Sequence, residues 1–268
     1  MSRKVPLLSV EGLALSFSGV QALRGINLDV MQGELVAIIG PNGAGKTSLF
    51  NCISGAYRPH AGRIQFGGVS LLGLPPESVA SQGVGRMFQN LLLFEHMTVL
   101  DNLMLGRHHR YHLPFWHDFF YTSKMRQAEI ANRRKVEEII EFLGLESVRK
   151  MPIGILPYGV LKRVELGRAL AMEPRLLLMD EPAAGLNREE TEDMARFVLD
   201  MKEVLGLTLV LIEHELRFVF DLADRVAVLD FGQKIADGPP DLIQADQRVL
   251  AAYTGVTSED GEQVESLA

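Results

Sequence analysis

Cysteine is almost absent from this chain, whose 268 residues include only Cys52. A single cysteine excludes an intramolecular disulfide bond and agrees with a reducing compartment. Cys52 falls within a predicted helix, where we expect it to be buried packing. Long hydrophobic runs are also missing, and none approaches the roughly 18 residues that a transmembrane helix requires. We therefore expect a soluble, cytoplasmic protein.

Positive charge is in short supply as well. Lys and Arg number 27 against 34 Asp and Glu, for a net charge of −7. Nucleic-acid-binding surfaces are usually basic, so this balance argues against nucleic acid as the main partner. Arg3 and Lys4 precede an apolar stretch, but Glu11 interrupts it and no cleavage site follows, which disfavours a signal peptide. The apolar content of 47% is enough for one large domain or two modest ones.

The most informative stretch runs from position 40 to 48 and reads GPNGAGKTS, which fits the phosphate-loop pattern G-x-x-x-x-G-K-[ST]. An apolar run at 35–39 leads into it and a helical pattern leaves it. Backbone N–H groups at a helix N-terminus bind a dense anion such as triphosphate, and glycines allow a close approach. A chance Gly-rich turn would not explain why every fixed position matches. The predicted phosphate-binding residues are Gly40, Pro41, Asn42, Gly43, Ala44, Gly45, Lys46, Thr47 and Ser48.

Two of these residues have predicted roles of their own. Lys46 would place a charge at the β- and γ-phosphates, and the Thr47 hydroxyl would be a ligand to Mg²⁺. The expected cofactors are therefore ATP and Mg²⁺.

A second informative feature is an acidic pair after a near-continuous apolar run at 175–179. Such a run is typical of a strand covered on both faces of a parallel sheet. Asp180 and Glu181 come at its C-terminal end, where open α/β sheets bind ligands. An ionised pair after an apolar run is costly unless it interacts with cations. Asp180 is predicted to hold Mg²⁺ through water, and Glu181 to be the general base on the attacking water. An exposed acidic pair is the alternative.

Two more polar residues follow predicted strands. Gln89 ends the strand at 84–88 and could reach Mg²⁺ and the attacking water, although alone this signal is weak. His214 follows the strand at 208–212 and could contact the γ-phosphate. Phe17 precedes the phosphate loop by 23 positions, and from spacing alone it is equally an adenine-stacking residue or an inward-facing strand aromatic.

The order of the predicted elements indicates an α/β fold. Residues 7–36 read as strands before the first helix, which suggests an antiparallel sheet beside a mixed core. From about 98 to 150 the strand pattern disappears, which indicates an all-helical insertion. The insertion contains His108 and His112, four apart; surface histidines are a commoner explanation than a metal site. Its aromatic residues suggest a contact with a partner protein.

Five pieces in this order resemble the ATP-binding subunit of ABC transporters. More closely, the chain resembles the ATPase of branched-chain amino acid importers, on LPYGVLKRVELGRAL (156–170), DEPAAGLN (180–187) and the ending AYTG (252–255). The five pieces are the loop at 40–47, Gln89, residues 156–160, residues 176–181 and His214.

The resemblance implies a P-loop NTPase core of the ABC ATPase type, with an antiparallel β subdomain and an all-helical insertion subdomain. The ATPase domain would span 1–256, with the helical subdomain at about 98–172 and an acidic, disordered tail at 257–268. Phe17 would stack on adenine, and Gln89 would link Mg²⁺ to the membrane subunit. Glu181 would be the catalytic base and His214 the switch histidine.

In this family the signature loop, here 156–160, contacts the γ-phosphate of ATP bound to the opposite subunit, so the active unit would be a dimer. The family pattern is L-S-G-G-Q, whereas this chain has Pro157 and Tyr158 before Gly159. Backbone N–H groups from Tyr158 onward can still face a phosphate. Asn187 replaces the usual Asp at the end of the loop before the acidic helix. These departures favour the importer subfamily and hint at a non-identical partner ATPase.

The leading hypothesis is an ATP-hydrolysing subunit that powers import of branched-chain amino acids or related small solutes. It would bind separate integral-membrane permease subunits and a second ATPase, identical or not, on the cytoplasmic face of the inner membrane. A lipopolysaccharide-export-type ABC ATPase has a similar core and is the alternative within this class. A soluble ABC ATPase acting on DNA or the ribosome would carry long insertions or two motor domains. A P-loop kinase needs no signature loop.

Overall fold

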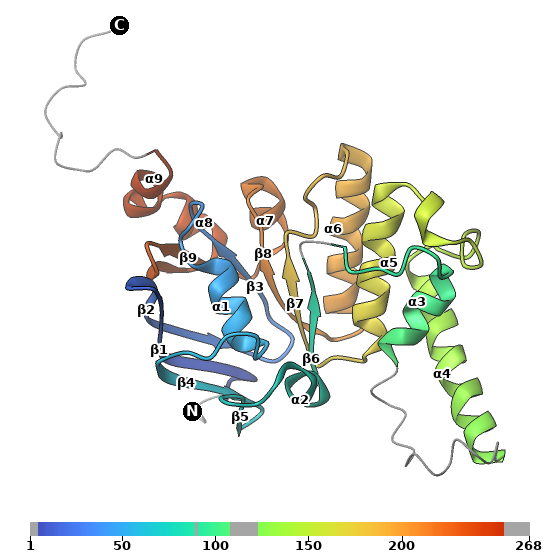
Figure 1. The fold of residues 1–268 in the computed structure, drawn as a ribbon. Coiled ribbons are helices and arrows are strands. Elements are labelled where there is room, and N and C mark those ends of the chain that lie inside the picture. The colour runs from blue at the N-terminus through green and yellow to red at the C-terminus, as the bar shows by residue number, and fades with distance from the viewer. Residues whose placement is uncertain (1–4, 89–90, 108–122, 255–268) are drawn as a thin grey trace, which may run out of the picture. The chain divides into compact units, whose positions relative to one another are not determined.

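The computed structural model describes residues 5–88, 91–107 and 123–254 (Figure 1). The chain divides into two compact units. The first combines Met1–Pro76 with Thr208–Ala268, and the second is Glu77–Leu207. No helix within the described ranges is both long and apolar enough to cross a membrane.

The first unit contains an antiparallel sheet in the order β2-β1-β4-β5. The strands are β1 (Leu8–Phe17), β2 (Val20–Val30), β4 (Ala61–Phe66) and β5 (Val69–Ser70). The central strand, β1, places Leu8 opposite both Val30 and Phe66, all three of which are buried. This sheet confirms the expected antiparallel β subdomain.

A second group of strands in the same unit carries the phosphate loop. Here the order is β10-β9-β3-β8, from β3 (Leu35–Ile39), β8 (Thr208–Ile212), β9 (Arg225–Asp230) and β10 (Gln233–Gly238). β3 runs parallel to β8 and β9, and every residue of β3 and β8 is fully buried. Strands covered on both faces read as continuous apolar runs, which is why the sequence revealed them. The helices of this unit are α1 (Lys46–Ile53), α7 (Leu216–Leu222), α8 (Pro240–Gln244) and α9 (Gln247–Thr254).

The second unit combines two parallel strands with a group of helices. β6 (Val84–Met87) pairs with β7 (Leu176–Asp180), with Met87 opposite Met179. Thr98 begins α3 with a capping box, because its hydroxyl accepts from the N–H of Asp101 and the Asp101 carboxylate accepts from the N–H of Thr98. The helices are α2 (Pro76–Ser81), which begins at the unit boundary, α3 (Val99–Gly106), α4 (Ser123–Phe142), the 3₁₀ turn η3 (Ile153–Ile155), α5 (Tyr158–Ala171) and α6 (Arg188–Glu203).

Several predicted boundaries are wrong by one or two residues. β7 includes Asp180, which the sequence placed after the strand, and β6 ends at Met87 instead of Phe88. The short elements β5, α7 and α8 were not predicted, because so few residues show no clear periodicity. The division into an ATPase domain at 1–256 and a helical subdomain at about 98–172 stays a prediction, and the tail at 257–268 lies outside the described residues.

Candidate active site

The loop that joins β3 to α1 is shaped by its three glycines. Gly40, Gly43 and Gly45 have φ angles of 146°, 81° and 102°. A Cβ atom on Gly40 would overlap the carbonyl oxygen of Leu229, and one on Gly45 would lie 2.5 Å from that of Ala22. A Cβ on Gly43 would meet nothing within 4 Å. Space and dihedral angle therefore both require glycine at 40 and 45, whereas at 43 the dihedral angle alone favours it.

The start of α1 and the Lys46 ammonium make this loop suitable for an anion. Gly45 is the N-cap residue, and within the described ranges no side-chain hydrogen bond caps the start of the helix. The Lys46 side chain is 6% exposed, and its Nζ donates to the carbonyl oxygens of Gly40 (2.7 Å) and Pro41 (3.0 Å). Helix N–H groups and an ammonium beside a glycine-rich loop fit a triphosphate.

His214 lies at the same sheet edge as this loop. β3 and β8 are parallel neighbours with Ile38 opposite Ile212, and Gly40 and His214 each come two residues after this pair. His214 is exposed, and its backbone N–H donates to Glu213 Oε2 over 3.1 Å. The structure therefore brings these two predicted site elements together within the first unit.

Phe17 ends β1 and is 45% exposed. Its ring packs edge-on against Tyr57, with centroids 5.1 Å apart and an interplanar angle of 72°. This exposure contradicts the inward-facing alternative, and an exposed ring face suits stacking on a base. Tyr57 is a neighbour that the sequence analysis did not identify.

The C-terminal helix α9 also reaches the phosphate loop. Burial raises the pKa of Tyr253, and the neighbouring backbone of Gly40 opposes this rise. The short ending AYTG, noticed in the sequence only as part of a resemblance, thus has a direct contact with the first glycine of the loop.

In the second unit, Asp180 is the last residue of β7 and is 1% exposed. Its Oδ2 pairs with Nη2 of Arg86 over 3.2 Å, while its Oδ1 is buried without a hydrogen-bond partner among the described residues. Burial raises the pKa of Asp180, and the neighbouring Arg86 opposes this rise. The unsatisfied oxygen fits a cation or a water bound to one.

The described ranges hold no cluster of three His, Cys, Asp or Glu side chains able to bind a metal. Mg²⁺ bound to a nucleotide needs no such cluster, because it keeps several waters and takes one or two protein ligands plus phosphate oxygens. The exposed hydroxyl of Thr47 and the buried carboxylate of Asp180 are ligands of the right type.

Glu181 follows Asp180 with a positive φ of 52°. Its carbonyl oxygen accepts from Lys162 Nζ (3.3 Å) and from the N–H of Ala184 (3.2 Å). A non-glycine residue in this conformation costs on the order of 1–3 kcal/mol, and such residues cluster at functional sites. The positive φ of Glu181 thus agrees with the functional role that its sequence position indicated.

The atypical signature segment begins α5. Pro157 is its N-cap residue and Tyr158, 43% exposed, its first helical residue. Gly159 is buried, and a Cβ there would overlap the carboxylate of Glu190. Asn187 caps α6, because its Oδ1 accepts from the N–H of Glu190 over 3.0 Å. The acceptor that replaces the usual aspartate is therefore engaged in a helix cap.

Two buried charged residues of α5 were missed by the sequence analysis. Lys162 is 0% and Glu165 1% exposed. Lys162 contacts the carbonyl of Glu181, and Glu165 Oε1 accepts from the N–H of Phe88 over 3.2 Å. The signal that could have found them is a Lys and a Glu three positions apart in the helix that follows the signature motif, which places both on one side of it.

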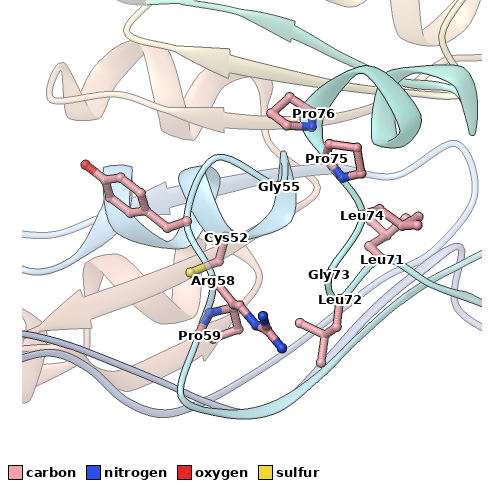
Figure 2. A pocket seen from close by; sticks show the side chains of 11 residues that line it. Cys52, Gly55, Arg58, Pro59, Leu71, Leu72, Gly73, Leu74, Pro75 and Pro76 are labelled. Atoms are coloured by element: carbon pink, nitrogen blue, oxygen red, sulfur yellow. The ribbon is translucent and has the colours of Figure 1, made fainter.

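A pocket of about 320 Å³ lies at the C-terminal end of α1 in the first unit (Figure 2). It is separate from the phosphate loop, since none of residues 40–48 lines it. Cys52 lines the pocket, and burial raises the pKa of its thiol to about 12, so the thiol is neutral at physiological pH. Cys52 is 3% exposed, which confirms the expectation that it is buried packing. The other lining residues are Gly55, Tyr57, Arg58, Pro59 and Leu71–Pro76.

The candidates Gln89, His108 and His112 lie outside the described ranges. A family model described as "ABC transporter" matches residues 23–184, which include the phosphate loop, the signature segment and Asp180-Glu181. The chain belongs to the ABC transporter family. It is an ATP-binding, ATP-hydrolysing transporter subunit, and its fold is the ABC ATPase fold.

Similar proteins cover nearly the whole chain of this ABC ATPase. The high-affinity branched-chain amino acid transport ATP-binding protein BraF of Pseudomonas aeruginosa is 38% identical over 95% of the chain and 99% of BraF. LivG of Escherichia coli, named for the same transport, is 36% identical over 93% of the chain and 98% of LivG. A further model, described as "Branched-chain amino acid ATP-binding cassette transporter", matches residues 233–258.

Solved structures of ATP-binding cassettes agree with this assignment. A nucleotide-free cassette from an ABC transporter is 32% identical, with a TM-score of 0.80 over 93% of this chain and 99% of that one. The ADP conformation of MJ1267, an ATP-binding cassette of an ABC transporter, is 31% identical, with a TM-score of 0.81 over 94% of this chain and all of that one.

Proposed function

We propose that this ATPase powers the import of branched-chain amino acids or related small solutes. The observation that carries the proposal is the 38% identity with BraF over 95% of the chain. The match of residues 233–258 to a model described as "Branched-chain amino acid ATP-binding cassette transporter" also supports it. A lipopolysaccharide-export ATPase and a soluble ABC ATPase are the alternatives that experiment must exclude.

The proposed roles of the site residues follow the family pattern. Loop residues 40–48 bind the phosphates of ATP, with Lys46 at the β- and γ-phosphates, and Phe17 stacks on adenine. Glu181 takes a proton from the attacking water as general base. His214 contacts the γ-phosphate. The exposed ring of Phe17 and the uncapped start of α1 support the first two roles.

Mg²⁺ is proposed to be held by Thr47, Asp180 and Gln89. When bound, it would neutralise charge that develops on the phosphate oxygens. The unsatisfied Oδ1 of Asp180 supports its part in this set. Arg86 fixes the other oxygen of the same carboxylate, which leaves Asp180 one oriented acceptor.

The working assembly is proposed to be a dimer of ATPase subunits, identical or not, bound to integral-membrane permease subunits. Residues 157–159 would contact ATP bound to the opposite subunit, with backbone N–H groups from Tyr158 onward, at the start of α5, facing the phosphate. This assembly would lie at the cytoplasmic face of the inner membrane. The domain division at 1–256, with a helical subdomain at about 98–172, belongs to the same proposal.

Two substitutions test the catalytic roles. Glu181→Gln should keep ATP binding and lower turnover by about 10²–10⁴-fold, roughly 3–5 kcal/mol of barrier, because the amide cannot accept the proton. Lys46→Ala should instead abolish tight binding. Both are measured by nucleotide titration and phosphate release. Turnover at the wild-type rate in Glu181→Gln would refute the general-base role.

The transport assignment is tested by purification from the native cell. A tagged chain is recovered from membranes in mild detergent, and the co-purifying proteins are identified. Multi-span permeases whose loss abolishes uptake of labelled leucine would support the proposal. Co-purification with lipopolysaccharide-export components would favour that alternative, and recovery without a membrane partner would favour a soluble ABC ATPase.

A further inference from the structure

Helix α5 buries an oppositely charged pair beside the catalytic segment. Lys162 and Glu165 are one helical turn apart, and neither is more than 1% exposed. Buried charges are costly unless they are paired and hydrogen-bonded. Residues three positions apart lie on the same side of a helix, and the Lys162 charge opposes the rise that burial causes in the pKa of Glu165.

The lysine end of this pair contacts the segment after β7. Its Nζ lies 3.3 Å from the carbonyl oxygen of Glu181, so an ammonium donates to the peptide of the proposed general base. That peptide belongs to a residue with φ of 52°. Strained backbone of this kind persists only where surrounding contacts hold it, and a charge-assisted hydrogen bond is a strong one.

The glutamate end contacts the end of β6. Its Oε1 accepts from the N–H of Phe88, the residue immediately before Gln89. The Arg86 guanidinium lies 4.7 Å from the centre of the Phe88 ring and pairs with Asp180. The ends of β6 and β7 are therefore both tied to one turn of α5.

We propose that Lys162 and Glu165 are positioning residues for hydrolysis: from one turn of the signature helix, Lys162 holds the Glu181 peptide and Glu165 holds the Phe88 N–H. This inference rests on the proposed role of Glu181 as general base. A movement of α5 would thus displace the general base and the start of the Gln89 segment together. Misplacing a catalytic group by about 1 Å can cost 10²-fold in rate.

The test uses the purified full chain with Mg²⁺ and ATP. Lys162→Met should lower kcat by about 10- to 100-fold and change the KM for ATP by less than about threefold, because Lys162 lies away from the phosphate loop in sequence and acts through Glu181. Arg163→Met is the matched control. It removes a cation from the adjacent position of α5, where Nη1 contacts the carbonyl of Leu143, and should leave kcat near wild type.

A double variant separates positioning from charge balance. Lys162→Met with Glu165→Gln leaves neither position charged and keeps an acceptor for the Phe88 N–H. Because no unpaired charge is buried at either position, the double variant is expected to fold. The proposal expects kcat to stay low in this folded double variant. Recovery of wild-type kcat would overturn it, as would a wild-type kcat in Lys162→Met. Glu181→Gln is measured in parallel: wild-type turnover there would show that the general-base assignment itself has failed.

Discussion

Replacing Glu165 by Gln should change how the stability of this ABC ATPase depends on pH. Burial raises the pKa of Glu165 from 4.5 to about 7, while Lys162, Arg168 and the N–H of Phe88 oppose the rise. Burial, and after it the nearby Glu165 carboxylate, raises the pKa of Tyr158. The second oxygen, Oε2, lacks a hydrogen-bond partner in the described part of the chain, which agrees with a carboxylate that ionises reluctantly.

The sign follows from the two pKa values. Between pH 4.5 and about 7, the folded state binds more protons at Glu165 than the unfolded state does. Stability from this group is therefore greatest at low pH and falls as the pH rises through that window. Linkage gives a loss of about 2.5 kcal/mol between pH 5 and pH 8. Gln cannot titrate and still accepts from Phe88, so the variant should escape this loss.

The assay is urea unfolding of wild type and Glu165→Gln, followed by circular dichroism at pH 5, 6, 7 and 8. Other groups titrate equally in both proteins, so the difference between their unfolding free energies isolates Glu165. This difference should move in favour of the variant by about 2.5 kcal/mol from pH 5 to pH 8. A difference constant within about 0.5 kcal/mol would refute the reasoning.

Two further predictions concern the loop and the acidic site. Gly45→Ala should lower stability by more than Gly43→Ala in thermal unfolding. Alanine at the positive φ of either position costs about 1–3 kcal/mol, but only at position 45 does its Cβ lie within 2.5 Å of a backbone oxygen. Equal losses would contradict the close approach. Arg86→Met should cost about 3–5 kcal/mol in urea unfolding, because it strands the buried carboxylate of Asp180. Arg188→Met, which breaks a fully surface-exposed pair, should cost at most about 1 kcal/mol, and a similar loss in both would argue against the buried ion pair.

Much of the fold was predictable because its signals are local. The strands β3 and β8 are continuous apolar runs, as expected of strands buried on both faces. The N-caps of α3 and α6, Thr98 and Asn187, are readable from residue type and the acid three positions later. Strand ends were less predictable, since the sequence does not show where ladder hydrogen bonds stop.

The sequence by itself determined the phosphate loop, because one contiguous stretch carries its glycines, its lysine and the start of its helix. Only the tertiary structure decided which buried charges meet. Arg86 and Asp180 are 94 residues apart, and Phe88 and Glu165 are 77 apart. No periodicity connects residues at such separations; the pairing of β6 with β7 and the packing of α5 bring them together. The positive φ of Glu181 is likewise a consequence of its surroundings, because nothing in a glutamate's own chemistry favours that conformation.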